Sequence, residues 1–132
     1  MKGTYILLIK LGRDADLGIG SLGKIKFRKG FYAYVGSGMN SLEKRIGRHT
    51  KRRKKKFWHI DYFLGFGNAS IKRVVSWKSS DKHECRAAGK LAARFENVTR
   101  FGCSDCACGS HLFYSEKFGT LEKAVLETSQ NF

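Results

Sequence analysis

Two tyrosines and the helix expected after the second carry residue types suited to phosphodiester chemistry. Tyr5 belongs to a GTY segment and Tyr34 to a YVG segment, and Arg45 and His49 follow four residues apart. Residues four apart share one face of a helix. A phenol or an imidazole can transfer a proton, while a guanidinium can hold the phosphate oxygens on which charge develops. The pattern suits a catalytic group, and core tyrosines beside plain phosphate contacts explain it equally well.

His59 and Asp61 form a second candidate pair, for acid–base chemistry or for metal binding. They would share a face on a strand but not on a helix. Asp61 is the only acidic residue between Glu43 and Asp81. An ion pair with an arginine or a histidine is therefore the simplest explanation for Asp61.

A cysteine-rich segment offers soft metal ligands. Its candidate ligands are Cys103, Cys106, Cys108 and His111, with Cys85 as a substitute. Thiolates and an imidazole at short spacing fit the tetrahedral geometry of Zn²⁺. The spacing matches no familiar zinc module, so free thiols that pack this loop are the favoured interpretation and zinc is the alternative.

The positive charge of the chain is concentrated in one segment. The 132 residues carry a net charge of +15, and nine lysines and arginines without an acid fall between residues 44 and 56. Such a density repels itself unless an anion neutralises it, and a polyphosphate backbone is the usual anion. We expect nucleic-acid contacts from Arg48, Lys51, Arg52, Arg53, Lys54, Lys55 and Lys56. A solvated loop or a membrane-surface patch is the alternative, but no helix with a wide apolar face accompanies this segment.

Composition predicts one folded domain over residues 1–132 that does not enter a membrane. The hydrophobic fraction of 42% is that of a folding chain, and no run approaches the ~18 apolar residues of a membrane helix. The crowded cysteines do not resemble the spaced framework of a small secreted fold. We therefore expect a cytoplasmic protein.

Periodicity predicts an α/β protein of the α+β kind, with a small, mostly antiparallel sheet flanked by helices. The expected strands cover residues 4–11, 24–27, 30–36, 70–77 and 111–115. The first three are expected to pair with one another, because their connections are too short for helical crossovers. The expected helices cover residues 41–50, 57–66, 82–95 and 120–128. Asn40 is the expected cap of the first helix and Asp81 that of the third.

The GTY and YVG segments, with the following SGMNSLEKRIGRH, resemble the GIY-YIG nuclease superfamily over residues 3–49. The later WHIDY, the pair Glu84-Cys85 and the segment GCSDCACGSHLFY are similar to an uncharacterised, mainly archaeal branch of it, which extends the resemblance to about residue 114. The chain departs from the usual pattern because 28 residues separate Tyr5 from Tyr34. This spacing predicts an extra hairpin near residues 12–28.

The resemblance implies roles for individual side chains. It assigns Tyr5 and Tyr34 to nucleophile or proton handling and Arg45 to stabilisation of the transition state. His49 and His59 match positions where homing-endonuclease members carry histidines.

The resemblance also implies one divalent cation held by a glutamate on a later helix, and Glu84 is the candidate. Mg²⁺ or Mn²⁺ suits a site with one carboxylate, several waters and phosphate oxygens. Family members supply an asparagine soon after this glutamate, a place that Asn97, Ser104 or Asp105 would fill here. Glu84 could instead only close a capping box with Asp81.

The expected function is divalent-metal-dependent endonuclease activity on phosphodiester bonds, with DNA favoured over RNA as the partner. The basic run at residues 51–56 would bind the phosphate backbone without reading base sequence. A monomer or a weak dimer is expected, and a single copy would cut one strand per visit. The alternative is a noncatalytic nucleic-acid-binding module on the same fold, stabilised by zinc.

Overall fold

Two long apolar strands form the centre of the protein. The computed structural model describes residues 2–38, 41–50, 58–78, 83–103 and 108–131. Strand β1 (Gly3–Leu11) pairs antiparallel with strand β4 (Gly30–Gly38) along its whole length, with Gly3 opposite Gly38. Successive side chains of a strand point to opposite faces, and β1 is buried on both faces. This position in the sheet therefore requires a nearly continuous apolar sequence.

Three further strands complete the main sheet within the described part of the chain. They are β5 (Ala69–Lys78), β6 (Glu96–Asn97) and β7 (Leu112–Ser115). The strand order is β5-β1-β4-β7-β6, and every neighbouring pair is antiparallel. The predicted α+β class with an antiparallel sheet is confirmed.

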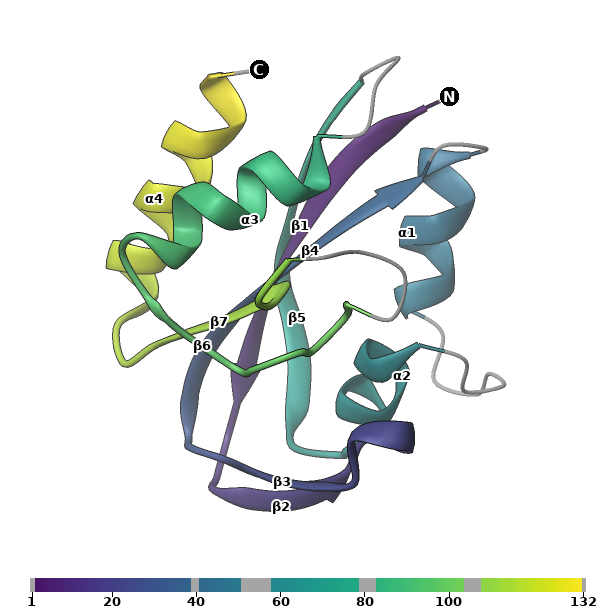
Figure 1. Cartoon of the computed structure of the whole chain (residues 1–132), viewed down its shortest axis with the longest axis vertical. Helices are drawn as coiled ribbons and strands as arrows, with labels where there is room; N and C mark the ends of the chain where they lie inside the picture. Colours follow the sequence, from purple (N-terminus) through teal and green to yellow (C-terminus); the bar gives the residue numbers. More distant parts are fainter. Residues whose placement is uncertain (1, 39–40, 51–57, 79–82, 104–107, 132) are drawn as a thin grey trace.

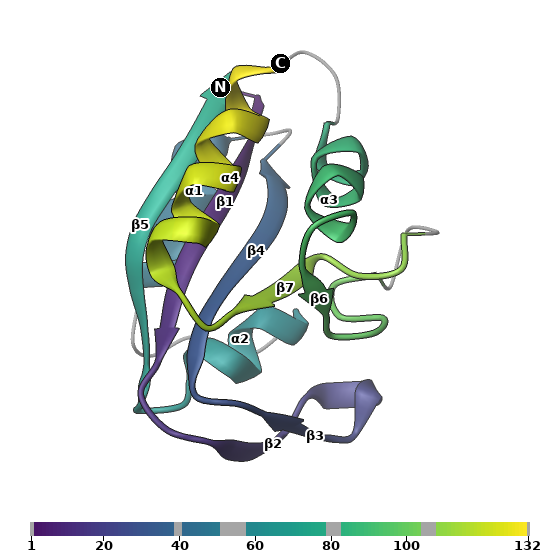
Figure 2. The same cartoon turned by 90° about the vertical axis from the view of Figure 1, so that its left-hand side faces the viewer.

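Helices cover both faces of this sheet, as Figure 1 and Figure 2 show. Helices α1 (Leu42–Thr50) and α2 (His59–Leu64) lie on one face. Helices α3 (Glu84–Ala92) and α4 (Phe118–Gln130) lie on the other. None of the helices in the described ranges is long and apolar enough to cross a membrane.

The alternation of β1 divides the buried side chains into two cores. The core beneath α1 and α2 includes Tyr5, Leu7, Ile9, Leu42, Ile60 and Phe63. The core beneath α3 and α4 includes Ile6, Leu8, Ala87, Leu91, Leu121 and Val125. Tyr5 therefore faces the same layer as α1, which brings it to the helix that carries Arg45 and His49.

The extra hairpin predicted near residues 12–28 is present. Strands β2 (Ala15–Gly18) and β3 (Lys24–Phe27) pair antiparallel with a short 3₁₀ helix, Gly20–Leu22, between them. The prediction that β3 belongs to the main sheet was wrong, because it pairs with β2 in a separate two-stranded sheet. Both edges of β1 are already occupied, one by β4 and one by β5, so β1 has no free edge for β3.

The helix positions were predicted well and their ends less well. The hydroxyl of Ser41 accepts the backbone N–H of Lys44 at 3.2 Å, so it caps α1; Asn40, the predicted cap, lies outside the described residues. Helix α2 ends at Leu64, with Gly65 as its C-cap. Helix α3 begins at Glu84, and the predicted cap Asp81 also lies outside the described residues.

A buried ion pair joins α1 to α2. The two terminal nitrogens of the Arg48 guanidinium donate to the two carboxylate oxygens of Asp61, each at 2.8 Å. Asp61 is fully buried, and it also accepts the backbone N–H of Trp58 at 2.9 Å. The ion pair predicted for Asp61 is therefore confirmed. Since α2 is a helix, His59 and Asp61 do not share a face.

Asp61→Ala should lower the free energy of unfolding by about 3 kcal/mol, because it leaves the Arg48 guanidinium without its carboxylate in a largely buried position. Urea denaturation followed by circular dichroism measures this change. The matched control is Glu127→Ala, which removes the acid of an exposed pair with Arg94. The control should cost less than about 1 kcal/mol, and an equal loss in both variants would contradict a special role for Asp61.

Candidate functional site

A close approach between neighbouring strands positions the first tyrosine. Tyr5 lies opposite Gly36 in the β1–β4 register. An ideal Cβ built on Gly36 would overlap the Cζ and hydroxyl oxygen of Tyr5. The Tyr5 ring therefore lies across β4 at a place where β4 has no side chain. Tyr34, two residues earlier on β4, shares the same face, and the two ring centroids are 6.5 Å apart.

The Tyr5 hydroxyl meets a histidine from α1. Tyr5 Oη and His49 Nε2 share a hydrogen bond of 2.5 Å. The two side chains are 1% and 3% exposed, so this hydrogen bond is shielded from solvent. A phenol and an imidazole in such contact can exchange a proton.

Arg45 approaches the same hydroxyl from one turn earlier on α1. Burial raises the pKa of Tyr5 above its ordinary value, and the charge and hydrogen bond of Arg45 partly oppose this increase. Burial also raises the pKa of Tyr34, with a further increase from the charges of Tyr5 and Glu84. Both tyrosines are therefore neutral phenols at neutral pH, and Arg45 is the group that favours ionisation of each.

Glu84, on the other helical layer, acts on this group through its charge. Strand β7 pairs with β4 only as far as Tyr34, so residues 35–38 of β4 extend beyond it. The first turn of α3 lies beside this open edge, next to the residue that precedes β7. The charge of Glu84 acts on the pKa of both Tyr5 and Tyr34. As the first residue of α3, Glu84 does not occupy the third position that the alternative capping box requires.

His59 holds a loop. Its Nδ1 accepts the backbone N–H of Gly102 at 2.9 Å. Gly102 has a φ of +77°, and an ideal Cβ there would lie 3.1 Å from the Cβ of His111 and 3.3 Å from Cε1 of Tyr34. Only a glycine fits this left-handed conformation and narrow gap. Gly102 thus lies between His59 and Tyr34, and His59 positions the loop that contains Gly102 beside the Tyr34 ring.

Of the residues expected to contact nucleic acid, only Arg48 lies within the described part of the chain. Arg48 pairs with Asp61, and the guanidinium carbons of Arg45 and Arg48 each lie 4.3 Å from the ring centroid of Trp58. Arg48 is therefore a structural residue rather than part of an open basic surface. The lysines and arginines at positions 51–56 lie outside the described residues.

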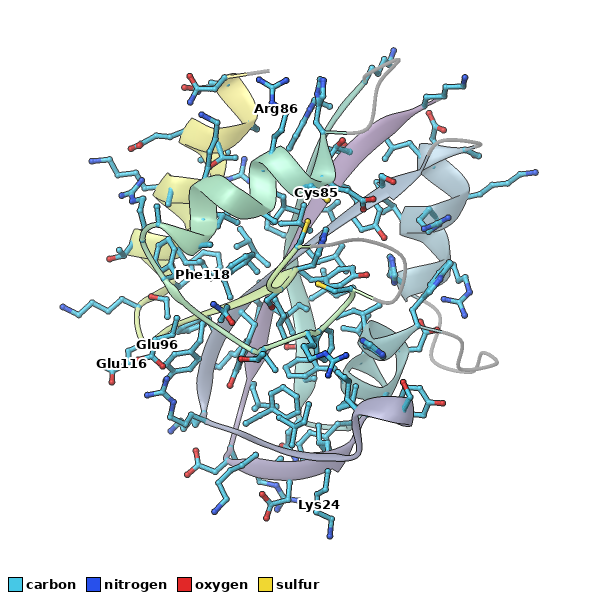
Figure 3. All side chains as sticks on the ribbon, in the orientation of Figure 1. Lys24, Cys85, Arg86, Glu96, Glu116 and Phe118 are labelled. Carbon is cyan, nitrogen blue, oxygen red and sulfur yellow. The ribbon has the colours of Figure 1, made fainter. Side chains whose placement is uncertain are left out.

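Three of the soft ligand candidates come together at the start of α3. The ligand atoms of Cys85, Cys108 and His111 all lie within 4.8 Å of one another, so these residues could hold a metal ion. Figure 3 shows Cys85 at the start of α3, beside the chain that leads into β7. Cys103, which the sequence placed in the ligand set, is not in this group, and its thiol lies 3.5 Å from the carbonyl oxygen of Phe101. Cys106 lies outside the described residues.

Sequence reasoning missed two features of the site. It treated Cys85 only as a substitute ligand, because a residue far from the cysteine-rich segment gives no spacing signal. It also gave no role to Gly102, whose positive φ carries no signal in a loop with several glycines. Asn97 lies elsewhere, in a pocket that Arg28 and Tyr114 also line; Ser104 and Asp105 are outside the described residues.

Comparison with known proteins gives one match. Residues 4–132 match the model of a family described as "Domain of unknown function DUF123". No curated protein and no solved structure matches the chain.

Gly36→Ala should destabilise the protein by about 2 kcal/mol, because the new methyl group overlaps the buried Tyr5 ring. Urea denaturation measures the loss. Gly18→Ala is the control, since it also lies in a strand but has no atom within 4 Å of the position that a Cβ would take. It should change stability by less than about 1 kcal/mol, and equal effects would mean that the Tyr5 contact is not special.

Low pH should lower the stability of the folded protein through protonation of His59. Burial lowers the pKa of His59 below its ordinary 6.5, so the unfolded chain binds the proton more tightly than the folded chain. The stabilisation from neutral His59 is complete above pH 6.5 and is lost as the pH falls through this value toward the folded pKa. His59→Asn keeps an acceptor for Gly102 but does not titrate. Its stability should fall less than that of the wild type between pH 7 and 5, in urea titrations across this range; parallel curves would refute the assignment.

Proposed function

The chain belongs to the DUF123 family, and we propose that it is a divalent-metal-dependent endonuclease that hydrolyses phosphodiester bonds in DNA. The observation that carries the proposal is the hydrogen bond of Tyr5 with His49, within reach of the Arg45 charge, at the point where GTY and YVG face each other. This antiparallel pairing also supports membership of the GIY-YIG nuclease superfamily, which the same two segments resemble.

Arg45 and Glu84 are the groups that would meet the substrate first. Both are partly exposed, whereas Tyr5 and Tyr34 are buried. The Arg45 guanidinium would bind the non-bridging phosphate oxygens and stabilise the negative charge that develops on them. Its position beside the Tyr5 hydroxyl would place the phosphorus close to a group able to transfer a proton.

Tyr5 and His49 would act together in that transfer. The raised pKa keeps the Tyr5 proton in place at neutral pH, while the Arg45 charge lowers the cost of its removal. His49 Nε2 is 2.5 Å away and would accept the proton, then return it. General acid–base catalysis of this kind contributes about 10²–10⁴-fold to a rate. Tyr34 would serve as the second phenol of the site.

Glu84 is the proposed ligand of Mg²⁺ or Mn²⁺. Magnesium keeps several waters and binds through one or two carboxylates plus substrate phosphates, so a single partly exposed carboxylate fits it. When bound, such an ion supplies Lewis-acid polarisation of the phosphoryl oxygen or an activated water. The placement of Glu84 within electrostatic reach of both tyrosines supports this role.

The basic run at residues 51–56 would supply affinity for the DNA backbone. It follows directly in the chain from α1, the helix that carries Arg45 and His49. Contacts of this kind are independent of base sequence and weaken steeply with salt. DNA is the favoured partner over RNA, for a cytoplasmic protein that acts as a monomer or a weak dimer.

A noncatalytic nucleic-acid-binding module is the second candidate, and burial favours it. Tyr5 is 1% exposed, His49 3% and Tyr34 8%, so the groups proposed for proton transfer are covered in the absence of substrate. In this alternative the tyrosines and His49 stabilise the fold, and Arg45 only contacts phosphate.

Purified protein should cleave plasmid or branched DNA with Mg²⁺ or Mn²⁺, and Glu84→Gln, Arg45→Ala and Tyr5→Phe should each lower the rate by at least about 100-fold. The matched control is Glu116→Gln, an exposed carboxylate that Figure 3 shows well separated from Cys85. It should cleave at the wild-type rate. Gel assays of nicked and linear product measure the rate.

DNA binding by fluorescence anisotropy, measured in parallel, separates the two candidates. Binding that persists in Glu84→Gln while cleavage stops supports the nuclease. Salt-sensitive binding without cleavage under either metal would leave only the binding module.

A further inference from the structure

We propose that Cys85, Cys108 and His111 bind one Zn²⁺ ion, which joins the first turn of α3 to the segment that leads into β7. The zinc site stands independently of the proposed nuclease function; only its effect on Glu84 rests on that function. Three observations support it: the convergence of the ligands, the orientation of the histidine and the chemistry of the donor set.

The three ligands come from two segments that are distant in the sequence. Cys85 is the second residue of α3, while Cys108 and His111 precede β7. Their donor atoms nevertheless lie within 4.8 Å of one another. Ligand atoms bound tetrahedrally to zinc at about 2.0–2.3 Å lie about 3.3–3.8 Å apart, so an inward shift of the side chains by about 1 Å completes the geometry.

The hydrogen bonds of His111 leave one ring nitrogen with the protonation state that a metal ligand needs. Its Nδ1 donates to the carbonyl oxygen of Val35 at 3.1 Å, which leaves the lone pair on Nε2. Histidines that bind metals commonly donate their other ring N–H to a carbonyl or carboxylate in this way. The backbone of His111 is fixed as well, because its N–H donates to Phe101 and its carbonyl accepts from Val35, each at 2.9 Å. The imidazole is therefore held by the sheet before any metal binds.

The donor set selects the metal. Two thiolates and one imidazole are soft and borderline donors that suit Zn²⁺, whereas Mg²⁺ prefers oxygen. Binding would release the two thiol protons, so affinity should rise with pH. Three protein ligands leave a fourth position for water or a further donor.

Zinc bound to Cys85, Cys108 and His111 would fix the position of Glu84. Glu84 and Cys85 are neighbours in the first turn of α3, so a bond from Cys85 to a metal held by His111 fixes that turn against the edge of β4. The larger core residue of α3, Leu91, lies near the other end of the helix, and the buried residues nearer the first turn are the small Ala87 and Ala88. Zinc would thus be a positioning element for Glu84 rather than a reacting group.

The test measures zinc in the full-length chain purified without chelator, by elemental analysis. The wild type should carry about one zinc per chain, and after stripping and reloading with Co²⁺ it should show the thiolate-to-cobalt absorption band. Cys85→Ser, Cys108→Ser and His111→Asn should each weaken zinc binding by more than about 100-fold. Cys103→Ser is the matched control from the same segment, and it should retain zinc and the cobalt band.

The outcomes are distinct. A wild-type protein without zinc, even after refolding with excess metal, overturns the proposal, as does equal zinc loss in Cys103→Ser and Cys85→Ser. Far-ultraviolet circular dichroism identifies a variant that fails to fold, in which case thiol accessibility in the wild type decides: Cys85 and Cys108 should react with a thiol reagent only after chelation. Zinc retained by a protein that never cleaves DNA would reject the nuclease and leave the zinc site standing.

Discussion

The contact of the Tyr5 ring with the bare backbone at Gly36 is the constraint on which the site depends. Neighbouring strands are too close for a large ring to cross a partner that carries a side chain, so one of the two opposed residues must be glycine. The β1–β4 register supplies that pairing. It directs the Tyr5 hydroxyl toward α1, where His49 and Arg45 meet it. Gly36 of the YVG segment thus makes room for the Tyr5 ring of the GTY segment. Both segments are needed to position the Tyr5 hydroxyl.

Sequence reasoning succeeded where a signal was local. The apolar runs of β1 and β4, the i to i+4 pattern of α1 and the long insertion between the tyrosines each predict an element within one stretch of chain. It failed where the outcome depended on competition among distant segments. Strand β3 was assigned to the main sheet because nothing in its own residues records that β5, far along the chain, occupies the edge it would need. The same limit applies to the ligand group, since only the tertiary structure brings Cys85 beside Cys108 and His111.

The basic residues of α1 have two different roles, an internal ion pair and a group at the candidate site, and composition does not distinguish them. Arg45 and Arg48 are three residues apart and both stack on Trp58, yet Arg48 forms an ion pair with the buried Asp61 while Arg45 approaches a phenol. One arginine stabilises the junction of α1 with α2, and the other is left facing the candidate site. A count of basic residues overstates the surface available to an anion, because part of that charge is neutralised internally.

The position of β1 between β4 and β5 also limits the order in which the sheet can form during synthesis. β1 leaves the ribosome before both of its neighbours, and its nine residues are almost entirely apolar. Of its two partners β4 is synthesised first, after the inserted hairpin, and the edge that β5 occupies has no partner until β5 emerges later. An apolar strand with an open edge is prone to self-association. The β2–β3 hairpin lengthens the interval in which β1 has no partner strand, because it separates β1 from β4 in the sequence.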